Sequence, residues 1–199
     1  MWQDNTFGNF DIFIAKSTDG GETFSTPENI SNNDGVSTFP RIAVNENNVY
    51  VVWQDGTDTP GSREIFIAKS INSGETFSSP ENISNNKGLS LSPQIAISDD
   101  NVYVVWSDDT DGFDKIFLSK STDGEETFST PENISDQKLE SDTSFAYQPS
   151  ITVNENNVYV VWHEDPQGER SIFISKSTDG GETFSTPENL SYKIGFSSK

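Results

Sequence analysis

One fifteen-residue segment, STDGGETFSTPENIS at 17–31, recurs four times with small changes in this chain of 199 residues. The copies begin at serines spaced 53, 51 and 56 residues apart, namely Ser17, Ser70, Ser121 and Ser177. The four tryptophans follow nearly the same spacing, at Trp2, Trp53, Trp106 and Trp162. A repeat of about fifty residues with one tryptophan in each copy indicates an array of similar units that stabilise one another by stacking.

Each copy contains four short segments that are typical of β-strands. In the second copy they are PRIAVN, NVYVVWQD, EIFIAKS and ETFSSPENIS. These segments are rich in Ile, Val, Phe, Tyr and Thr and are bounded by Asn, Asp, Gly or Pro, as strands usually are. No segment shows a sustained helical period, so the sequence predicts an all-β fold with almost no helix.

The second and third segments of each copy are apolar on both faces. In VYVVW, Val49, Val51 and Trp53 point to one side of the strand, while Tyr50 and Val52 point to the other. A sheet with one face in water would alternate apolar and polar residues instead. A small sheet that is buried on both faces and repeats at this period predicts a blade of a β-propeller. The fourth segment of each copy contains a proline, which places it at the outer edge of the blade.

The chain therefore predicts a single propeller or partial propeller over 1–199, with about three and a half four-stranded blades. The half blade spans 1–38, and the complete blades span about 39–91, 92–146 and 147–199. An open arc would expose an apolar blade face at each end. We therefore expect a fragment of a larger ring, a homo-oligomer that completes the ring, or a strained small ring.

The pattern S-x-D-x-G-x-T-F resembles the Asp-box, or BNR repeat, of the sialidase superfamily. It covers four segments, which we call the box turns: 17–24, 70–77, 121–128 and 177–184. The resemblance implies a β-propeller in which each box forms the hairpin between the third and fourth strands of a blade. It also implies that the boxes lie on the face opposite the catalytic pocket.

The residue types in the box turns favour a structural role over a ligand or metal site. A short Asp can accept hydrogen bonds from its own turn, glycine permits a positive φ, and the final Phe can pack into the blade. The predicted structural residues are Ser17, Asp19, Gly21, Thr23, Phe24, Ser70, Asn72, Gly74, Thr76, Phe77, Ser121, Asp123, Thr127, Phe128, Ser177, Asp179, Gly181, Thr183 and Phe184. Asn72 replaces the Asp in the second copy, and Glu125 replaces the glycine in the third.

The resemblance also implies what a sialidase site would need: three arginines for the substrate carboxylate, a Tyr–Glu nucleophile pair and an Asp acid/base. The chain contains three arginines, and only Arg41, in FPRI, is similar to the family's arginine motif. Tyr147 and Tyr192 lie outside the repeated positions, but neither has a recognisable Glu partner. We therefore expect no enzyme activity; if the chain is an enzyme, the resemblance implies an exo-α-sialidase-like glycosidase.

An acidic segment follows each tryptophan, and propeller topology places these segments on the presumed ligand face. The predicted binding residues are Asp55, Asp58, Trp106, Asp108, Asp111 and Glu164. Four carboxylates in DDTDGFD, those of Asp108, Asp109, Asp111 and Asp114, are the oxygen ligands that calcium prefers. Solvated surface charge is the alternative, and no other cofactor is expected. His163 is predicted to be a solvated loop residue.

Composition excludes several partners. The chain has 32 acidic and 12 basic residues and a formal charge of −20, which disfavours nucleic acid and anionic membranes. It has no cysteine and no apolar stretch long enough to span a membrane, and its N-terminus does not read as a signal peptide. The N-[I/L]-S sequons at Asn29, Asn82, Asn133 and Asn189 favour an extracellular or cell-surface location.

These features predict a non-catalytic binding or surface module that recognises carbohydrate or protein through the loops after the tryptophans. A sialidase-type glycoside hydrolase, whole or truncated, is the first alternative. A repetitive propeller that self-assembles as a structural unit is the second.

Overall fold

The computed structural model describes residues 1–6, 8–56, 61–122, 127–136, 144–165 and 170–191. Its elements are strands that form four antiparallel sheets, each a meander of consecutive strands. Blade 1 has three strands: β1 (Trp2–Asp4), β2 (Asp11–Ile14) and β3 (Glu28–Asn29). Blade 2 has four: β4 (Thr38–Asn45), β5 (Asn48–Asp55), β6 (Glu64–Ser70) and β7 (Glu81–Asn82). Blade 3 has β8 (Ser90–Ser98), β9 (Asn101–Asp108), β10 (Lys115–Ser121) and β11 (Glu132–Asn133). Blade 4 has β12 (Ala146–Asn154), β13 (Asn157–Glu164), β14 (Ser171–Ser177) and β15 (Glu188–Asn189).

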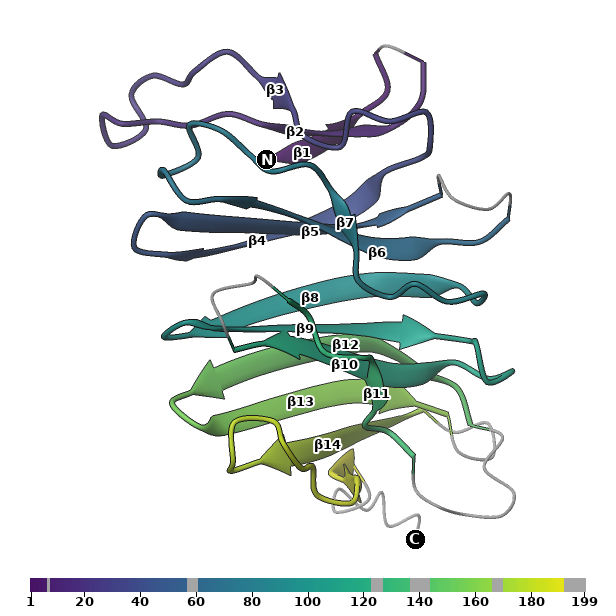
Figure 1. Ribbon diagram of the computed structural model, residues 1–199. Coiled ribbons are helices and arrows are strands. Elements are labelled where there is room, and N and C mark those ends of the chain that lie inside the picture. Colours follow the sequence, from purple (N-terminus) through teal and green to yellow (C-terminus); the bar gives the residue numbers. More distant parts are fainter. Residues whose placement is uncertain (7, 57–60, 123–126, 137–143, 166–169, 192–199) are drawn as a thin grey trace, which may run out of the picture.

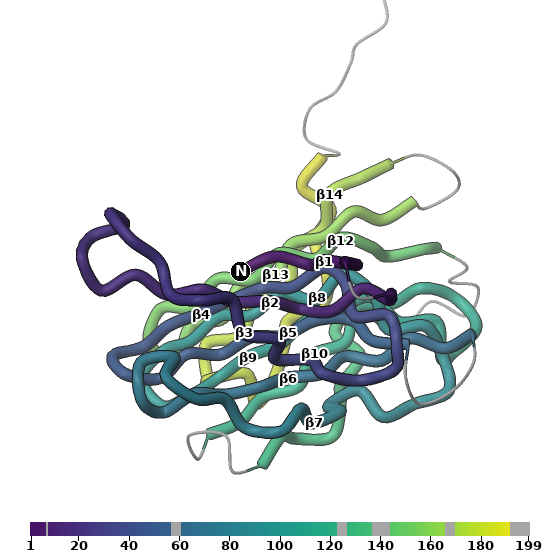
Figure 2. Tube along the Cα trace, turned by 90° about the horizontal axis from the view of Figure 1, so that it is seen from above, coloured from purple at the N-terminus to yellow at the C-terminus, as the bar shows by residue number. Residues whose placement is uncertain are grey.

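The four sheets stack face to face in chain order, from blade 1 to blade 4 (Figure 1). The first strands β4, β8 and β12 are neighbours, and successive blades overlap when the stack is viewed along its length (Figure 2). The predicted all-β propeller architecture is confirmed. Within the described residues, no helix is long and apolar enough to cross a membrane.

The apolar core lies between blades, as the two-sided strand pattern requires. Trp53, Val51 and Ala68 pack with Ile12 and Ile30 of blade 1. The other face of blade 2, with Tyr50 and Val52, packs with Trp106 of blade 3. Trp162 packs in the same way against Tyr103 and Val105 of blade 3. Trp53, Trp106 and Trp162 therefore each face the preceding blade, and three similar apolar interfaces hold the stack together.

The rim strands β3, β7, β11 and β15 are shorter than predicted, with two residues each. The proline precedes the strand instead of lying within it, because it has no N–H to donate to the ladder. In blades 1 and 2, a buried serine just after the rim strand hydrogen-bonds to the neighbouring strand. Ser31 Oγ accepts from Ile12 N at 3.0 Å and donates to Asp11 Oδ1 at 2.9 Å. Likewise, Ser84 Oγ accepts from Ile65 N and donates to Glu64 Oε2. These two sequon serines therefore have a structural role.

Each first strand contains a β-bulge beside its N-terminal end. The pairing register shifts between Thr38 and Arg41 in β4, and a shift occurs at the corresponding place in β8 and β12. The extra residue has a left-handed backbone, with φ of 55° at Phe39, 56° at Ser92 and 52° at Gln148. Bulges of this kind redirect side chains and are common next to functional sites.

Candidate functional site

The box turns are closed by their own hydrogen bonds. In the first turn, Asp19 Oδ1 accepts from Thr23 N at 3.0 Å, and Asp19 Oδ2 accepts from Thr23 Oγ1 at 2.5 Å. Ser17 Oγ donates to Asp19 Oδ1 at 2.7 Å and accepts from Gly21 N at 2.8 Å. Bonds from Thr23 and Ser17 hold the pKa of Asp19 well below its ordinary value. The carboxylate is therefore occupied within its own turn.

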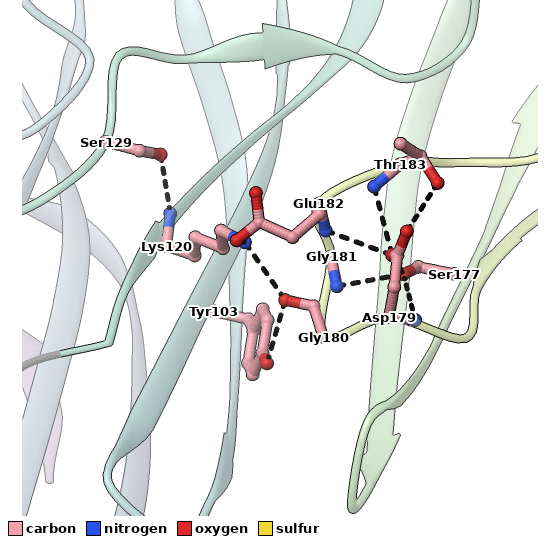
Figure 3. Close-up of polar contacts among 9 residues, drawn as sticks. All are labelled: Tyr103, Lys120, Ser129, Ser177, Asp179, Gly180, Gly181, Glu182 and Thr183. Carbon is pink, nitrogen blue, oxygen red and sulfur yellow. Dashed lines mark hydrogen bonds and ion pairs between the residues drawn. The ribbon is translucent and has the colours of Figure 1, made fainter.

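The second and fourth turns repeat this arrangement. Asp179 accepts from Ser177 and Thr183, whose bonds lower its pKa (Figure 3). Asn72 Oδ1 accepts from Ser70 Oγ at 2.8 Å and from Thr76 N at 3.0 Å, so the amide oxygen accepts the same two hydrogen bonds as the carboxylate does in the other turns. Asp123 and Glu125 of the third turn lie outside the described residues; Ser121, Thr127 and Phe128 of that turn are described.

The final phenylalanine of a box turn packs between two blades and not only into its own. Phe77, Phe128 and Phe184 each join the apolar cluster that their blade shares with the preceding one. Phe24, in blade 1, is 66% exposed. The position of this ring therefore depends on a neighbouring blade.

Three of the predicted ligand residues are buried. Asp55, Asp108 and Glu164 are at most 1% exposed, and each accepts a hydrogen bond from the tryptophan two residues earlier, at 2.8–3.1 Å. A serine at or just before the start of the blade's first strand also donates to each carboxylate: Ser37, Ser90 and Ser144. Trp106 itself is completely buried. Each carboxylate forms an internal latch with its tryptophan and serine in blades 2, 3 and 4, and the structure does not place these residues on the predicted ligand face.

The latch of blade 3 shows how a buried charge is accommodated. Asp108 Oδ2 accepts from Ser90 Oγ and Asn86 Nδ2, both at 2.6 Å, and from Trp106 Nε1 at 3.1 Å. Burial opposes the charge, but the hydrogen bonds from Ser90, Thr110 and Asn86 outweigh it and keep the pKa of Asp108 below its ordinary value.

The predicted calcium cluster does not form. Asp108 is held in its latch, Asp109 accepts from Leu89 N, and Asp111 is exposed. Burial and the charges of Asp109 and Asp108 raise the pKa of Asp114. Among the residues that the structure describes, which include all four of these carboxylates, no three acidic or histidine side chains come together to hold a metal ion. Asp58, the remaining predicted ligand residue, lies outside the described residues.

The three arginines have different local partners. Arg41 Nη1 donates to the carbonyl of Pro40 at 3.0 Å, and Arg63 Nη1 donates to Thr38 Oγ1 at 3.2 Å. The Arg170 guanidinium lies over the ring of Tyr147, 5.7 Å from its centroid. None of these contacts links one arginine to another.

Shallow hollows recur along the rim between successive blades. Each hollow is lined by two segments from successive blades. The pairs of segments are 28–32 and 77–80, 81–85 and 128–131, and 132–136 and 184–187. The three hollows use the same motif segments and follow directly from blade stacking. A specialised site requires a place where the repeat is broken.

The repeat is broken at the start of blade 4. Tyr147 of β12 pairs with His163 of β13, and their rings stack with centroids 5.8 Å apart and an interplanar angle of 13°. Tyr147 Oη donates to Asp165 Oδ1 at 2.9 Å, and Arg170 covers the same ring. The pair that corresponds to Tyr147 and His163 is Thr38 and Gln54 in blade 2. In blade 3 the corresponding pair is Leu91 and Ser107.

Two phenylalanines extend this cluster. Phe145, which is 46% exposed, makes an edge contact with Phe113 at 5.5 Å, and its carbonyl accepts from Asp165 N at 3.2 Å. We call the six residues the Tyr147 patch: Phe113, Phe145, Tyr147, His163, Asp165 and Arg170. The prediction of His163 as a solvated loop residue is wrong, because it lies in β13, is half-buried and is stacked on Tyr147.

The fold is a β-propeller of the kind that is found in several glycoside hydrolases. The chain is similar to a Hadza microbial sialidase, with a TM-score of 0.63 and 17% identity, over 89% of this chain and 40% of that one. It is also similar to a GH93 α-L-arabinofuranosidase of Fusarium graminearum, with a TM-score of 0.61 and 15% identity, over 89% of this chain and 57% of that one. A Trypanosoma rangeli sialidase is similar with a TM-score of 0.61 and 14% identity, over 92% of this chain and 33% of that one.

The likeness at these identities establishes the fold. The chain spans well under two thirds of the length of these three structures. No family model and no curated protein sequence matches the chain.

Proposed function

We propose that this chain is a non-catalytic Asp-box propeller module that binds carbohydrate on the Tyr147 patch. The observation that carries the proposal is the clustering of non-repeated aromatic and charged residues at one end of β12 and β13. Phe145, which is 46% exposed, offers an apolar ring to the C–H face of a sugar, and Tyr147, Asp165 and Arg170 offer polar groups to its hydroxyls or carboxylates. A few polar groups set among aromatic side chains are the usual make-up of a small-molecule site.

The protonation state of Tyr147 bears on whether the Tyr147 patch binds a ligand or reacts with it. A tyrosine nucleophile must lose its proton readily, as activated nucleophiles do. Here desolvation and the hydrogen bond to Asp165 raise the pKa of Tyr147, although the Arg170 charge opposes the shift. Asp165 accepts the phenol proton in a hydrogen bond and keeps the phenol protonated, but the same geometry would let Asp165 act as a base, so the sialoside turnover assay described below decides between binding and catalysis.

The similar structures support a carbohydrate ligand. One of them is a GH93 α-L-arabinofuranosidase in complex with arabinobiose, and another similar structure is a Trypanosoma rangeli sialidase in complex with sialic acid. Sialosides and arabino-oligosaccharides are therefore the first two classes of ligand to test. The sialidase-type alternative depends on Arg41, which in this structure contacts only the neighbouring carbonyl of Pro40 among the bonds described.

The test is binding to a panel of both ligand classes by wild-type protein and by Tyr147→Ala and Arg170→Ala. We expect saturable binding to at least one class and at least a tenfold loss in each variant, with folding unchanged. Arg41→Ala is the matched control and should bind as wild type does. Turnover of a fluorogenic sialoside that disappears in Arg41→Ala would overturn the proposal in favour of the enzyme.

The proposal includes an extracellular or cell-surface location and requires no cofactor. The high net negative charge favours solubility, which suits such a setting. Fractionation of the native source, followed by detection of the protein in the medium or on intact cells, would test the location.

A further inference from the structure

The two ends of the blade stack expose faces that are buried everywhere else in the stack. Blade 1 lies at one end of the stack (Figure 1), and we call its residues Trp2, Phe13 and Phe24 the Trp2 face. Trp2 is 38% exposed, whereas the other three tryptophans are at most 1% exposed. Phe24 is 66% exposed, whereas its counterparts pack between blades.

The far side of blade 4 presents the opposite kind of face. We call it the Tyr159 face, and it includes Tyr159, Lys176 and Leu190. Tyr159 is 38% exposed, whereas its counterparts Tyr50 and Tyr103 are 3% and 0% exposed. Leu190 is 38% exposed, whereas its isoleucine counterparts in the other blades are at most 5% exposed.

The interface between blades 3 and 4 shows what such a pair of faces does when it is closed. Tyr103 Oη donates to the carbonyl of Gly180 at 3.2 Å (Figure 3). Lys120 Nζ donates to the same carbonyl at 3.1 Å and to Glu182 Oε1 at 2.6 Å. A methyl group at Gly181 would lie 3.2 Å from Tyr103 Cε1, so the box turn fits closely against the preceding blade.

The same contact recurs between blades 1 and 2, where Lys16 pairs with Glu75. At the open end of blade 1, Gly21 occupies the position of Gly181, and no heavy atom lies within 4 Å of a methyl group placed there. Lys176 and Glu22, the two members of the next pair in this series, are both exposed.

We propose that the Tyr159 face of one copy binds the Trp2 face of a second copy, head to tail. Tyr159 then donates to the carbonyl of Gly20 of the second copy, and Lys176 pairs with Glu22 of the second copy. The occupant is a second copy because the two faces carry both halves of a contact set that this chain already uses between its own blades. This inference is independent of the carbohydrate proposal.

Apolar burial must drive this association. An exposed Lys–Glu pair contributes little, and two chains of charge −20 repel each other. Screening of that repulsion should make association at least as tight in 0.5 M salt as at physiological salt. Head-to-tail contacts also leave one free face at each end, so growth continues until a ring closes.

The test is light scattering after size exclusion with wild type, Phe24→Asp, Leu190→Asp and the control Ile71→Asp. Ile71 is 70% exposed on the inner blade 2, so its variant should associate as wild type does. Wild type should give at least twice the 22.0 kDa mass of one chain, and the two face variants should be folded monomers. A wild-type monomer at all accessible concentrations would overturn the proposal.

Mixing the two face variants tests the direction of the contact. Phe24→Asp retains an intact Tyr159 face, and Leu190→Asp retains an intact Trp2 face. Their equimolar mixture should form a one-to-one dimer that grows no further. Association of Leu190→Asp alone, with no gain on mixing, would show a face-to-same-face contact and contradict the head-to-tail arrangement.

Discussion

The carboxylate latch of blade 3 should stabilise the fold strongly, and Asp108→Ala tests this. The substitution removes the acceptor of Trp106 Nε1 and Ser90 Oγ, two donors on residues that are completely buried. Each buried donor without a partner costs about 1–3 kcal/mol, so the variant should lose about 4 kcal/mol in the free energy of unfolding. For a chain of this size, that loss lowers Tm by roughly 10 °C.

The assay is thermal and urea unfolding followed by circular dichroism, with Asp111→Ala as the control. Asp111 is exposed, and its truncation should change the free energy of unfolding by about 0.5 kcal/mol or less. If the Tm of Asp108→Ala equalled that of Asp111→Ala and of the wild type, the latch would have no stabilising role. The interpretation of the three buried carboxylates as structural would then be wrong.

Three further predictions concern the box turns. Phe77→Ala should lower the free energy of unfolding by about 2 kcal/mol, because the half-buried ring packs in the core between blades 1 and 2. Phe24→Ala should be nearly neutral in dilute protein, because that ring is exposed. Equal losses of unfolding free energy in the two variants, measured by urea unfolding, would contradict this. Asp19→Ala should lower Tm because Thr23 loses its acceptor, and an unchanged melting curve would contradict the structural role of the turn. Asp179→Asn should still fold, because Asn72 already occupies the same position in the second box turn. Its Tm at neutral pH should be lower than that of wild type. The lowered pKa of Asp179 stabilises the fold above the unfolded value of about 3.9, and this stabilisation is lost as the pH falls through the folded value. The Tm gap to wild type should therefore shrink below about pH 4, and a constant gap down to pH 2 would argue against this linkage.

The fold was predictable because the repeat supplies the same information several times. Both faces of VYVVW are apolar in three copies, and only stacking between neighbours buries both. The burial of Asp55 and Asp108 was not predicted, because an acidic residue beside a loop suggests solvent exposure. The available signal was its recurrence two residues after each tryptophan, the same argument that places Tyr50 and Tyr103 in the core.

The Tyr147 patch was only partly predictable. Tyr147 stands out in the sequence because it falls outside the repeated tyrosine positions, and His163 stands out where other copies have Gln or Ser. Their stacking depends on the β12–β13 register, which includes a bulge between Tyr147 and Ser150. A bulge adds one residue to one strand, so sequence distance alone does not show which side chains face each other.

The central claim is that the repeated residues build the propeller and the non-repeated patch binds the ligand. The most direct measurement is isothermal titration of wild type and Tyr147→Ala with the best ligand from the sialoside and arabino-oligosaccharide panel, with Tm recorded for both proteins. The account predicts saturable binding by wild type, loss of binding in Tyr147→Ala and the same Tm within about 2 °C. Equal affinity of the two proteins, or no saturable binding by wild type to any ligand of the panel, would contradict it.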